Sequence, residues 1–186
     1  MKRDMKQAMK GVLRFIEGEV LRMNALWLVR LIYGDFWTFR KKLKVQTSPA
    51  WWKRCLYYKY LEHFGAWIGL GAIFDGDPVL PHGLSGIFIS HSAKLGKGCV
   101  LFQRVTIGSN MLKDARIVGS PTLGDNVYVG AGASLIGGVH IGDNVRIGAN
   151  CPVAKDVPAN STVVIGDVKI ISSPIKLDNQ WIENKQ

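Results

Sequence analysis

Cysteine is scarce in this sequence, with three residues, Cys55, Cys99 and Cys151, among 186. Cysteines so few and so far apart exclude the disulfide framework of a small secreted protein. The four histidines are scattered as well, and no two of them sit at a ligand spacing with a cysteine or a carboxylate. We therefore expect no metal site.

A long uncharged apolar run is also lacking. The most apolar part, residues 20–39, is interrupted by Arg22, Arg30 and Asp35, which argues against a membrane-spanning helix. The basic residues 1–10 are not followed by the apolar core and small-residue cleavage site of a secretory signal. These features predict a cytoplasmic protein.

Acidic residues are rare only in the first third of the chain. Residues 1–60 hold 14 Lys and Arg against 4 Asp and Glu, whereas residues 61–186 hold 10 of each, so the net charge of +10 belongs to the first third. A charge this concentrated points to a partner or a surface. The same segment carries four of the six tryptophans, at Trp27, Trp37, Trp51 and Trp52. This change in composition marks a boundary near residue 65.

Beyond that boundary the sequence repeats every six residues. An aliphatic side chain recurs in one phase, with one interruption, at Ile89, Leu95, Leu101, Ile107, Ile117, Leu123, Val129, Leu135, Ile141, Ile147 and Val153. A small or β-branched side chain follows four residues later, at Ala93, Cys99, Val105, Val127, Ala133, Val139, Val145, Cys151 and Val157. Both positions are expected to face a core, which makes Cys99 and Cys151 small buried hydrophobes.

A period of six fits neither an amphipathic helix nor a simple alternating strand. Short β-strands that turn at every sixth residue do satisfy it. Stacking such turns buries the aliphatic positions, and each coil supplies backbone hydrogen bonds to the next. The sequence therefore predicts a mainly β solenoid.

Two runs of the repeat, LGDNVYVGAGASLIGG and IGDNVRIGANCPVAKDVP, are similar to the hexapeptide-repeat acyltransferases, and the resemblance covers roughly residues 68–171. The segment HGLSGIFISHSAKLGKGCVLFQRVTIG most resembles serine acetyltransferases and their relatives that acetylate capsular or exopolysaccharide sugars. The resemblance implies a left-handed parallel β-helix with three hexads per coil, and a homotrimer. We divide the chain into an α-helical region at 1–66, the β-helix at 67–171 and a C-terminal tail at 172–186.

The helical region is expected to hold two main helices. The apolar stripe of the first follows three- and four-residue spacing at Leu13, Ile16, Val20, Met23, Trp27 and Leu31. For the second, Ser48 is the expected cap, Pro49 the first turn and Gly65 the end. One side of this second helix carries Trp52, Cys55, Leu56 and Tyr60.

A basic run, RKKLK at residues 40–44, lies between these helices. Two interpretations stay open: a solvated charge run, and peripheral contact with anionic lipids at the inner membrane face. The aromatic and aliphatic side chains would equally pack the helices together or join a second trimer. We expect no nucleic-acid partner, because no known binding module accompanies the charge.

Acetyl transfer to a hydroxyl needs a base, for which histidine is suited. His82 stands in LPHGLSG, a turn bracketed by proline and glycine just before the regular coils. The resemblance implies that a histidine here is the general base, and a turn-forming structural role is the alternative. The remaining histidines lie in the second helix or at outward repeat positions, at His63, His91 and His140.

The resemblance implies further site residues, with departures. Serine acetyltransferases orient the base with an aspartate, but the matching position falls near Trp67, so Asp77 is the candidate partner and a plain turn residue is its alternative role. The irregular stretch 109–120 matches the loop that reaches a neighbouring site. Ser120 stands where these enzymes carry a histidine, and Arg116 is a candidate contact for a larger polar acceptor.

For the donor, the family holds the pantetheine arm of acetyl-CoA along glycine-rich coils between subunits. The matching residues are Gly130, Ala131, Gly148 and Ala149, although a tight turn would demand the same glycines. Lys155 and Lys169 are candidates for the nucleotide phosphates.

The resemblance, together with these residues, implies an acetyl-CoA-dependent O-acetyltransferase with His82 as general base. The missing aspartate and loop histidine favour a saccharide or glycan precursor as the acceptor. Serine O-acetylation in cysteine biosynthesis is the alternative, and a non-catalytic trimeric scaffold is a second one.

Overall fold

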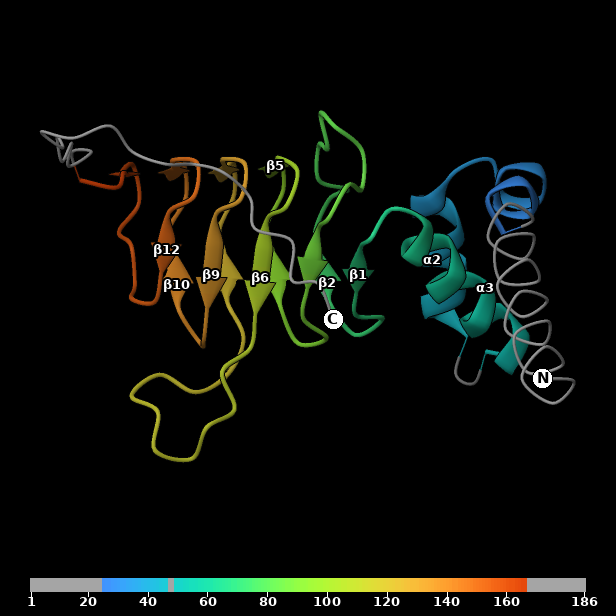
Figure 1. Cartoon of the computed structure of the whole chain (residues 1–186), viewed down its shortest axis with the longest axis horizontal. Helices are drawn as coiled ribbons and strands as arrows, with labels where there is room; N and C mark the ends of the chain where they lie inside the picture. Colours follow the sequence, from blue (N-terminus) through green and yellow to red (C-terminus); the bar gives the residue numbers. More distant parts are fainter. Residues whose placement is uncertain (1–24, 47–48, 167–186) are drawn as a thin grey trace, which may run out of the picture.

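The computed structural model describes residues 25–46 and 49–166, and it places a small helical region at one end of a long stack of short strands (Figure 1). Residues 25–33 are helical, and α2 (Phe36–Val45) and α3 (Trp51–His63) follow. The strands are β1 (Trp67–Ile68), β2 (Ile73–Phe74), β3 (Phe88–Ile89), β4 (Lys94–Leu95), β5 (Val100–Leu101), β6 (Thr106–Gly108), β7 (Thr122–Leu123), β8 (Tyr128–Val129), β9 (Ser134–Ile136), β10 (His140–Ile141), β11 (Arg146–Ile147), β12 (Pro152–Val153) and β13 (Thr162–Val163).

The strands stack into three parallel sheets, which form the sides of one coiled body. The strand orders are β1-β3-β6-β9-β12, β2-β4-β7-β10 and β5-β8-β11-β13. The chain visits the three sheets in turn and then pairs with itself one coil further on, as where Thr106 of β6 lies opposite Ser134 of β9. The structure is thus a parallel β-helix, as the period of six predicts.

The core confirms the two inward positions of the repeat. Every aliphatic position from Ile89 to Val153 is buried except Ile117, and all nine positions of the second set are buried. Ile117 is half-buried because it belongs to the loop at 109–120, where the repeat is interrupted, and the phase resumes at Leu123 in β7. Burial raises the pKa of the Cys99 thiol, which suits a structural role for this residue.

One corner of the coil is built from asparagines in the left-handed backbone conformation. Asn126, Asn144 and Asn160 have φ angles of 55°, 57° and 59°. Asparagine tolerates this conformation better than other residues with a Cβ. The side-chain amide of Asn126 donates to Asn144 at 3.3 Å, and that of Asn144 donates to Asn160 at 3.0 Å, so the side chains also join successive coils.

The helical region covers the first coil. β1 and β2 are edge strands, so backbone carbonyls at this end have no earlier coil to pair with. The Tyr57 hydroxyl donates to the carbonyl of Ile68 at 2.9 Å. The buried Arg40 guanidinium donates to the carbonyl of Ala72 at 2.5 Å and lies 4.4 Å from the centre of the Phe74 ring. These side chains complete the hydrogen bonding that a further coil would provide.

The faces that the helices bury differ from those predicted. Of the first predicted stripe, Leu13 to Met23 lie outside the described residues, and Trp27 and Leu31 are 66% and 65% exposed. Ala25 and Val29 are buried instead. In α3 the buried residues are Tyr57 and Leu61, whereas Trp52 and Cys55 of the predicted side are exposed.

The ends of α3 also differ in part. Ser48 lies outside the described residues, and the helix begins after Ala50, which makes no side-chain capping bond. At the other end Gly65 has a φ of +58°, and the N–H of Ala66 reaches back to the carbonyl of Leu61 at 3.0 Å. This is a Schellman ending, which requires the left-handed glycine, so Gly65 follows the helix as expected. The first strand begins two residues later, at Trp67.

Within the described ranges, no helix is long and apolar enough to cross a membrane. The same part of the chain contains no group of three or more histidine, cysteine, aspartate or glutamate side chains placed to hold a metal ion.

Candidate functional site

His82 lies in an enlarged turn of the first coil. From Trp67 to its sheet partner Phe88 the chain takes 21 residues, whereas from Phe88 to Thr106 it takes 18, so the first coil has three residues more. The turn is held by Gly83, whose N–H donates to the Leu80 carbonyl at 3.0 Å. Leu84 anchors the turn in the core, and the His82 side chain is exposed.

The imidazole of His82 is oriented by the next coil. Its Nδ1 lies 2.5 Å from Oε1 of Gln103, and its ring packs edge-on against Phe102, with the ring centres 5.5 Å apart. An amide oxygen only accepts hydrogen bonds, so in this arrangement Nδ1 carries the proton. The lone pair of the neutral ring is then on Nε2, which is the requirement for a general base.

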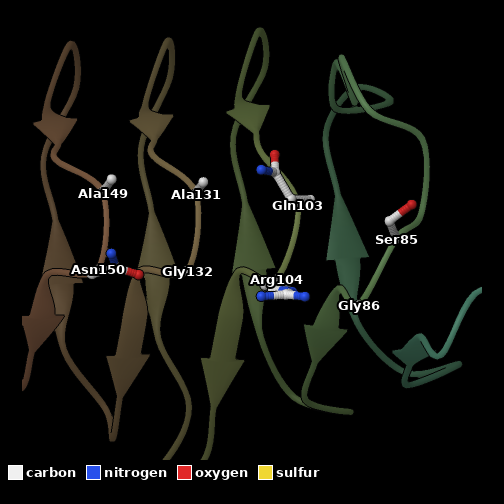
Figure 2. Close-up of a pocket in the computed structure, with 8 residues that line it drawn as sticks. All are labelled: Ser85, Gly86, Gln103, Arg104, Ala131, Gly132, Ala149 and Asn150. Atoms are coloured by element: carbon white, nitrogen blue, oxygen red, sulfur yellow. The ribbon is translucent and has the colours of Figure 1, made fainter. Parts of the chain in front are cut away.

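A groove that includes Gln103 runs along a corner of the coils (Figure 2). It measures about 640 Å³ and is lined by Ser85, Gly86, Gln103, Arg104, Ala131, Gly132, Ala149 and Asn150. Each successive coil contributes one pair of these residues. The side chains at 131, 132 and 149 are small, which leaves room for a narrow ligand close to the backbone.

Backbone donors are available in this groove. The N–H groups of Gly132 and Asn150 are bonded to carbonyls of Gln103 and Ala131, at 3.0 and 2.8 Å. The N–H groups of Ala131 and Ala149, by contrast, donate to no acceptor among the described residues. A ligand that carries carbonyl groups would find two unused donors spaced one coil apart.

The predicted glycines lie where successive coils approach each other closely. Gly130 and Gly148 precede the two alanines and are not among the residues that line the groove. A Cβ on Gly130 would lie 2.7 Å from the backbone nitrogen of Ala149, so the close approach of the next coil requires this glycine. Lys155 is exposed after β12 and does not line the groove, and Lys169 lies outside the described residues.

The partner of Asp77 in the protomer is Lys41, whereas the sequence suggested His82. Its carboxylate lies 2.5 Å from Nζ of Lys41 in α2, where it links the helical region to the first coil. The structure brings Gln103 to His82, and sequence reasoning missed this residue. The length of the first coil could have indicated this contact, because Gln103 follows His82 by 21 residues and the enlarged first coil also spans 21 residues.

The loop at 109–120 extends away from the stack and is drawn in yellow below the coils in Figure 1. Its base is closed by reciprocal backbone hydrogen bonds between Asn110 and Gly119, and by a contact of 2.7 Å between the hydroxyls of Ser109 and Ser120. Arg116 lines a separate hollow of about 430 Å³ with Asn110, Leu112, Asp114 and other residues of the loop and coil. Within one protomer, therefore, neither Arg116 nor Ser120 lines the groove beside His82.

Parts of the chain are similar to known transferases. Residues 120–154 match the family model described as bacterial transferase hexapeptide, six repeats. A serine acetyltransferase of Synechococcus elongatus is 42% identical over 102 residues, which are 55% of this chain and 38% of that protein. One of Helicobacter pylori is 39% identical over 111 residues, which are 59% of each chain. The chain thus spans from about four tenths to six tenths of the length of these relatives.

Solved structures of serine acetyltransferases are also similar to this chain. Serine acetyltransferase isoform 3 of Entamoeba histolytica, in complex with cysteine, has a TM-score of 0.62 and 26% identity, covering 75% of this chain and 50% of that one. The Neisseria gonorrhoeae serine acetyltransferase in complex with serine has a TM-score of 0.59 and 25% identity, covering 89% and 72%. The fold is a left-handed parallel β-helix, as predicted. The relatives named here are serine acetyltransferases, and the predicted capsular or exopolysaccharide subgroup finds no support among them.

Proposed function

We propose that this protein transfers an acetyl group from acetyl-CoA to the hydroxyl of serine. The observation that carries the proposal is His82, whose Nδ1 contacts Gln103, a residue that lines a groove with two unused backbone donors. A base of fixed tautomer beside a narrow binding groove is the arrangement that acyl transfer between two bound molecules needs.

In the proposed step, Nε2 of His82 removes the proton of the acceptor hydroxyl while its oxygen attacks the thioester carbonyl carbon. The carbon–oxygen bond forms, the carbon–sulfur bond breaks, and CoA leaves as a thiolate that is protonated to the free thiol. Gln103 keeps the Nδ1 proton in place throughout, so the imidazolium that forms keeps a hydrogen-bond acceptor.

The pantetheine arm is proposed to lie along the groove. Its amide carbonyls would accept from the N–H groups of Ala131 and Ala149, and the small side chains let the arm approach the backbone. A side chain larger than that of alanine at position 131 or 149 would fill the space proposed for the arm. Lys155 remains a proposed contact for the nucleotide phosphates, from its exposed position after β12.

Serine fits the acceptor position better than a neutral saccharide. Arg104 lines the groove next to Gln103, and its guanidinium has no acidic partner among the described residues. A cation there suits an acceptor that carries a carboxylate. The serine acetyltransferases among the relatives support the same choice.

We also propose that the working unit is a homotrimer in which the loop at 109–120 reaches the groove of a neighbouring subunit. Met111 and Leu112 on this loop are 74% and 66% exposed, and Trp67, Phe88 and Tyr128 are apolar residues on the outer faces of strands that are each at least 40% exposed. Apolar surface of this extent on both loop and coil is typical of a subunit interface. Arg116 and Ser120 would then act in the neighbouring site.

Thiol release from acetyl-CoA tests the function, with L-serine and a panel of saccharides as acceptors. We expect release with serine, and a loss of about 10²- to 10⁴-fold in His82→Ala. The matched control is His140→Ala, because this histidine is exposed in β10 and is hydrogen-bonded through its backbone: its N–H donates to Asp156 and its carbonyl accepts from the N–H of Val157. Release with a saccharide alone would overturn serine as acceptor. No turnover with any acceptor would favour the scaffold.

A further inference from the structure

The exposed apolar side chains of the helical region have no role in the proposed chemistry. Trp51 and Trp52, at the start of α3, are 77% and 47% exposed, and Trp27 and Leu31 of the preceding helix are 66% and 65% exposed. A tryptophan buries about 200 Å² or more when it is covered, so leaving several of them in water is costly. These side chains therefore point to a partner surface.

Positive charge accompanies these side chains. Residues 25–46 and 49–66 contain eight lysines and arginines but only two acids, Asp35 and Glu62. Asp35 caps α2 by accepting from the N–H of Thr38 at 3.0 Å, and Glu62 contacts Lys59 at 2.8 Å. The local excess of cations is thus not neutralised by the acids of this region.

The first turn of α3, which we define as Trp51, Trp52, Lys53 and Arg54, combines both features. It contains no acidic residue, and Nζ of Lys53 lies 5.5 Å from the ring centre of Trp52. A helix N-terminus with cations on its first turn attracts anions. Tryptophan is the residue that best occupies the boundary between lipid headgroups and acyl chains.

We propose that this protein docks on a bilayer surface that contains anionic lipids, through the first turn of α3. No described helix is long enough to span the bilayer, so the contact is peripheral. The helical region forms one end of the molecule, so the coils and the groove extend away from the docking end (Figure 1). The proposal does not depend on the acetylation reaction.

Vesicle flotation of the full chain tests the charge. We expect binding to vesicles of phosphatidylcholine with phosphatidylglycerol at low salt, weaker binding at high salt, and little binding to phosphatidylcholine alone. Replacing Lys53→Glu and Arg54→Glu together should weaken binding by about tenfold or more. The control is Lys94→Glu with Lys97→Glu, which makes the same change in net charge at exposed positions of the coil.

Tryptophan quenching tests the geometry. Lipids with brominated acyl chains should quench the fluorescence of the bound protein, and Trp51→Phe with Trp52→Phe should remove most of that quenching. Binding lost equally in the coil control would overturn docking through α3. No binding to anionic vesicles at low salt would overturn the proposal. If light scattering then showed the same α3 variants to disrupt a larger assembly, the occupant of this surface would be a second copy of the chain.

Discussion

At the scale of single residues, the contact between His82 and Gln103 makes a prediction about pH. An amide at 2.5 Å from Nδ1 fixes the tautomer without adding charge. In Gln103→Glu a carboxylate would stabilise the imidazolium, and the base works only when neutral. The acid limb of the activity profile should therefore move to higher pH, by about one unit or more.

The variant Gln103→Leu separates the effect of the added charge from the effect of losing the hydrogen-bond acceptor. It removes the acceptor without introducing charge, so we expect activity to fall by about tenfold or more at every pH, with no upward move of the acid limb. Thiol release measured across pH separates the two variants. If the profile of Gln103→Glu matched that of the unaltered protein, Gln103 would have no positioning role for His82.

The site could be predicted from sequence only where a motif marks it. His82 stands in a distinctive turn, and Ala131 and Ala149 are proposed from the resemblance to the glycine-rich coils of the family. Gln103 and Arg104 escaped because their nearness to His82 and to the alanines depends on stacking, which sets one coil beside the next. Asp77 was proposed from nearness in sequence, and in space its carboxylate faces Lys41.

At the scale of elements, Arg40 determines how α2 attaches to the first coil. Its buried guanidinium donates to the carbonyl of Ala72 and lies within 3.4 Å of the carbonyls of Gly69 and Leu70. Arg40→Met keeps the stem but removes the guanidinium donor from all three. The carbonyl of Ala72 keeps Nζ of Lys44 at 2.9 Å and that of Gly69 keeps the N–H of Ala72 at 3.1 Å, whereas the carbonyl of Leu70 loses its donor. We expect the free energy of unfolding to fall by about 2–4 kcal/mol.

Urea denaturation measures this loss, and Lys41→Met is the matched control in the same helix. Like Arg40, Lys41 is a cation of α2 that contacts the first coil, where it pairs with Asp77. Its side chain is 63% exposed, so removing this ion pair should lower the free energy of unfolding by about 1 kcal/mol or less. Equal losses in the two variants would mean that the buried contacts of Arg40 contribute no more than a surface ion pair.

The elements differ in how far their sequence determines them. The coils were predictable because each hexad repeats the same local requirement, and the core confirms the phase from β3 to β12. The position of α3 was predictable but its buried face was not, and α2, which contains the basic run at 40–44, was not predicted as a helix. Tyr57 was not on the predicted side because its burial depends on the Ile68 carbonyl of the first coil, a tertiary contact that helical spacing does not contain.

At the scale of the whole molecule, the separation of His82 from Arg116 matters most. Both are exposed, but they lie in different parts of one protomer. Arg116 belongs to the loop whose base is closed by the reciprocal hydrogen bonds between Asn110 and Gly119. A site that needs both residues must therefore draw them from two chains. In a cyclic trimer each chain would give its loop to one neighbour and receive a loop from the other.

This arrangement predicts complementation between two inactive variants. His82→Ala removes the base but keeps the loop, and Arg116→Ala keeps the base but removes the proposed acceptor contact. A mixed trimer of either composition contains one complete site among three, and random mixing makes about three quarters of all trimers mixed. We therefore expect co-expressed variants to recover on the order of a quarter of the activity of the unaltered protein. Variants that are purified separately and mixed only after folding should recover activity no faster than subunits exchange between trimers. A co-expressed sample with no more activity than the two homotrimers combined would show that each site is complete within one chain.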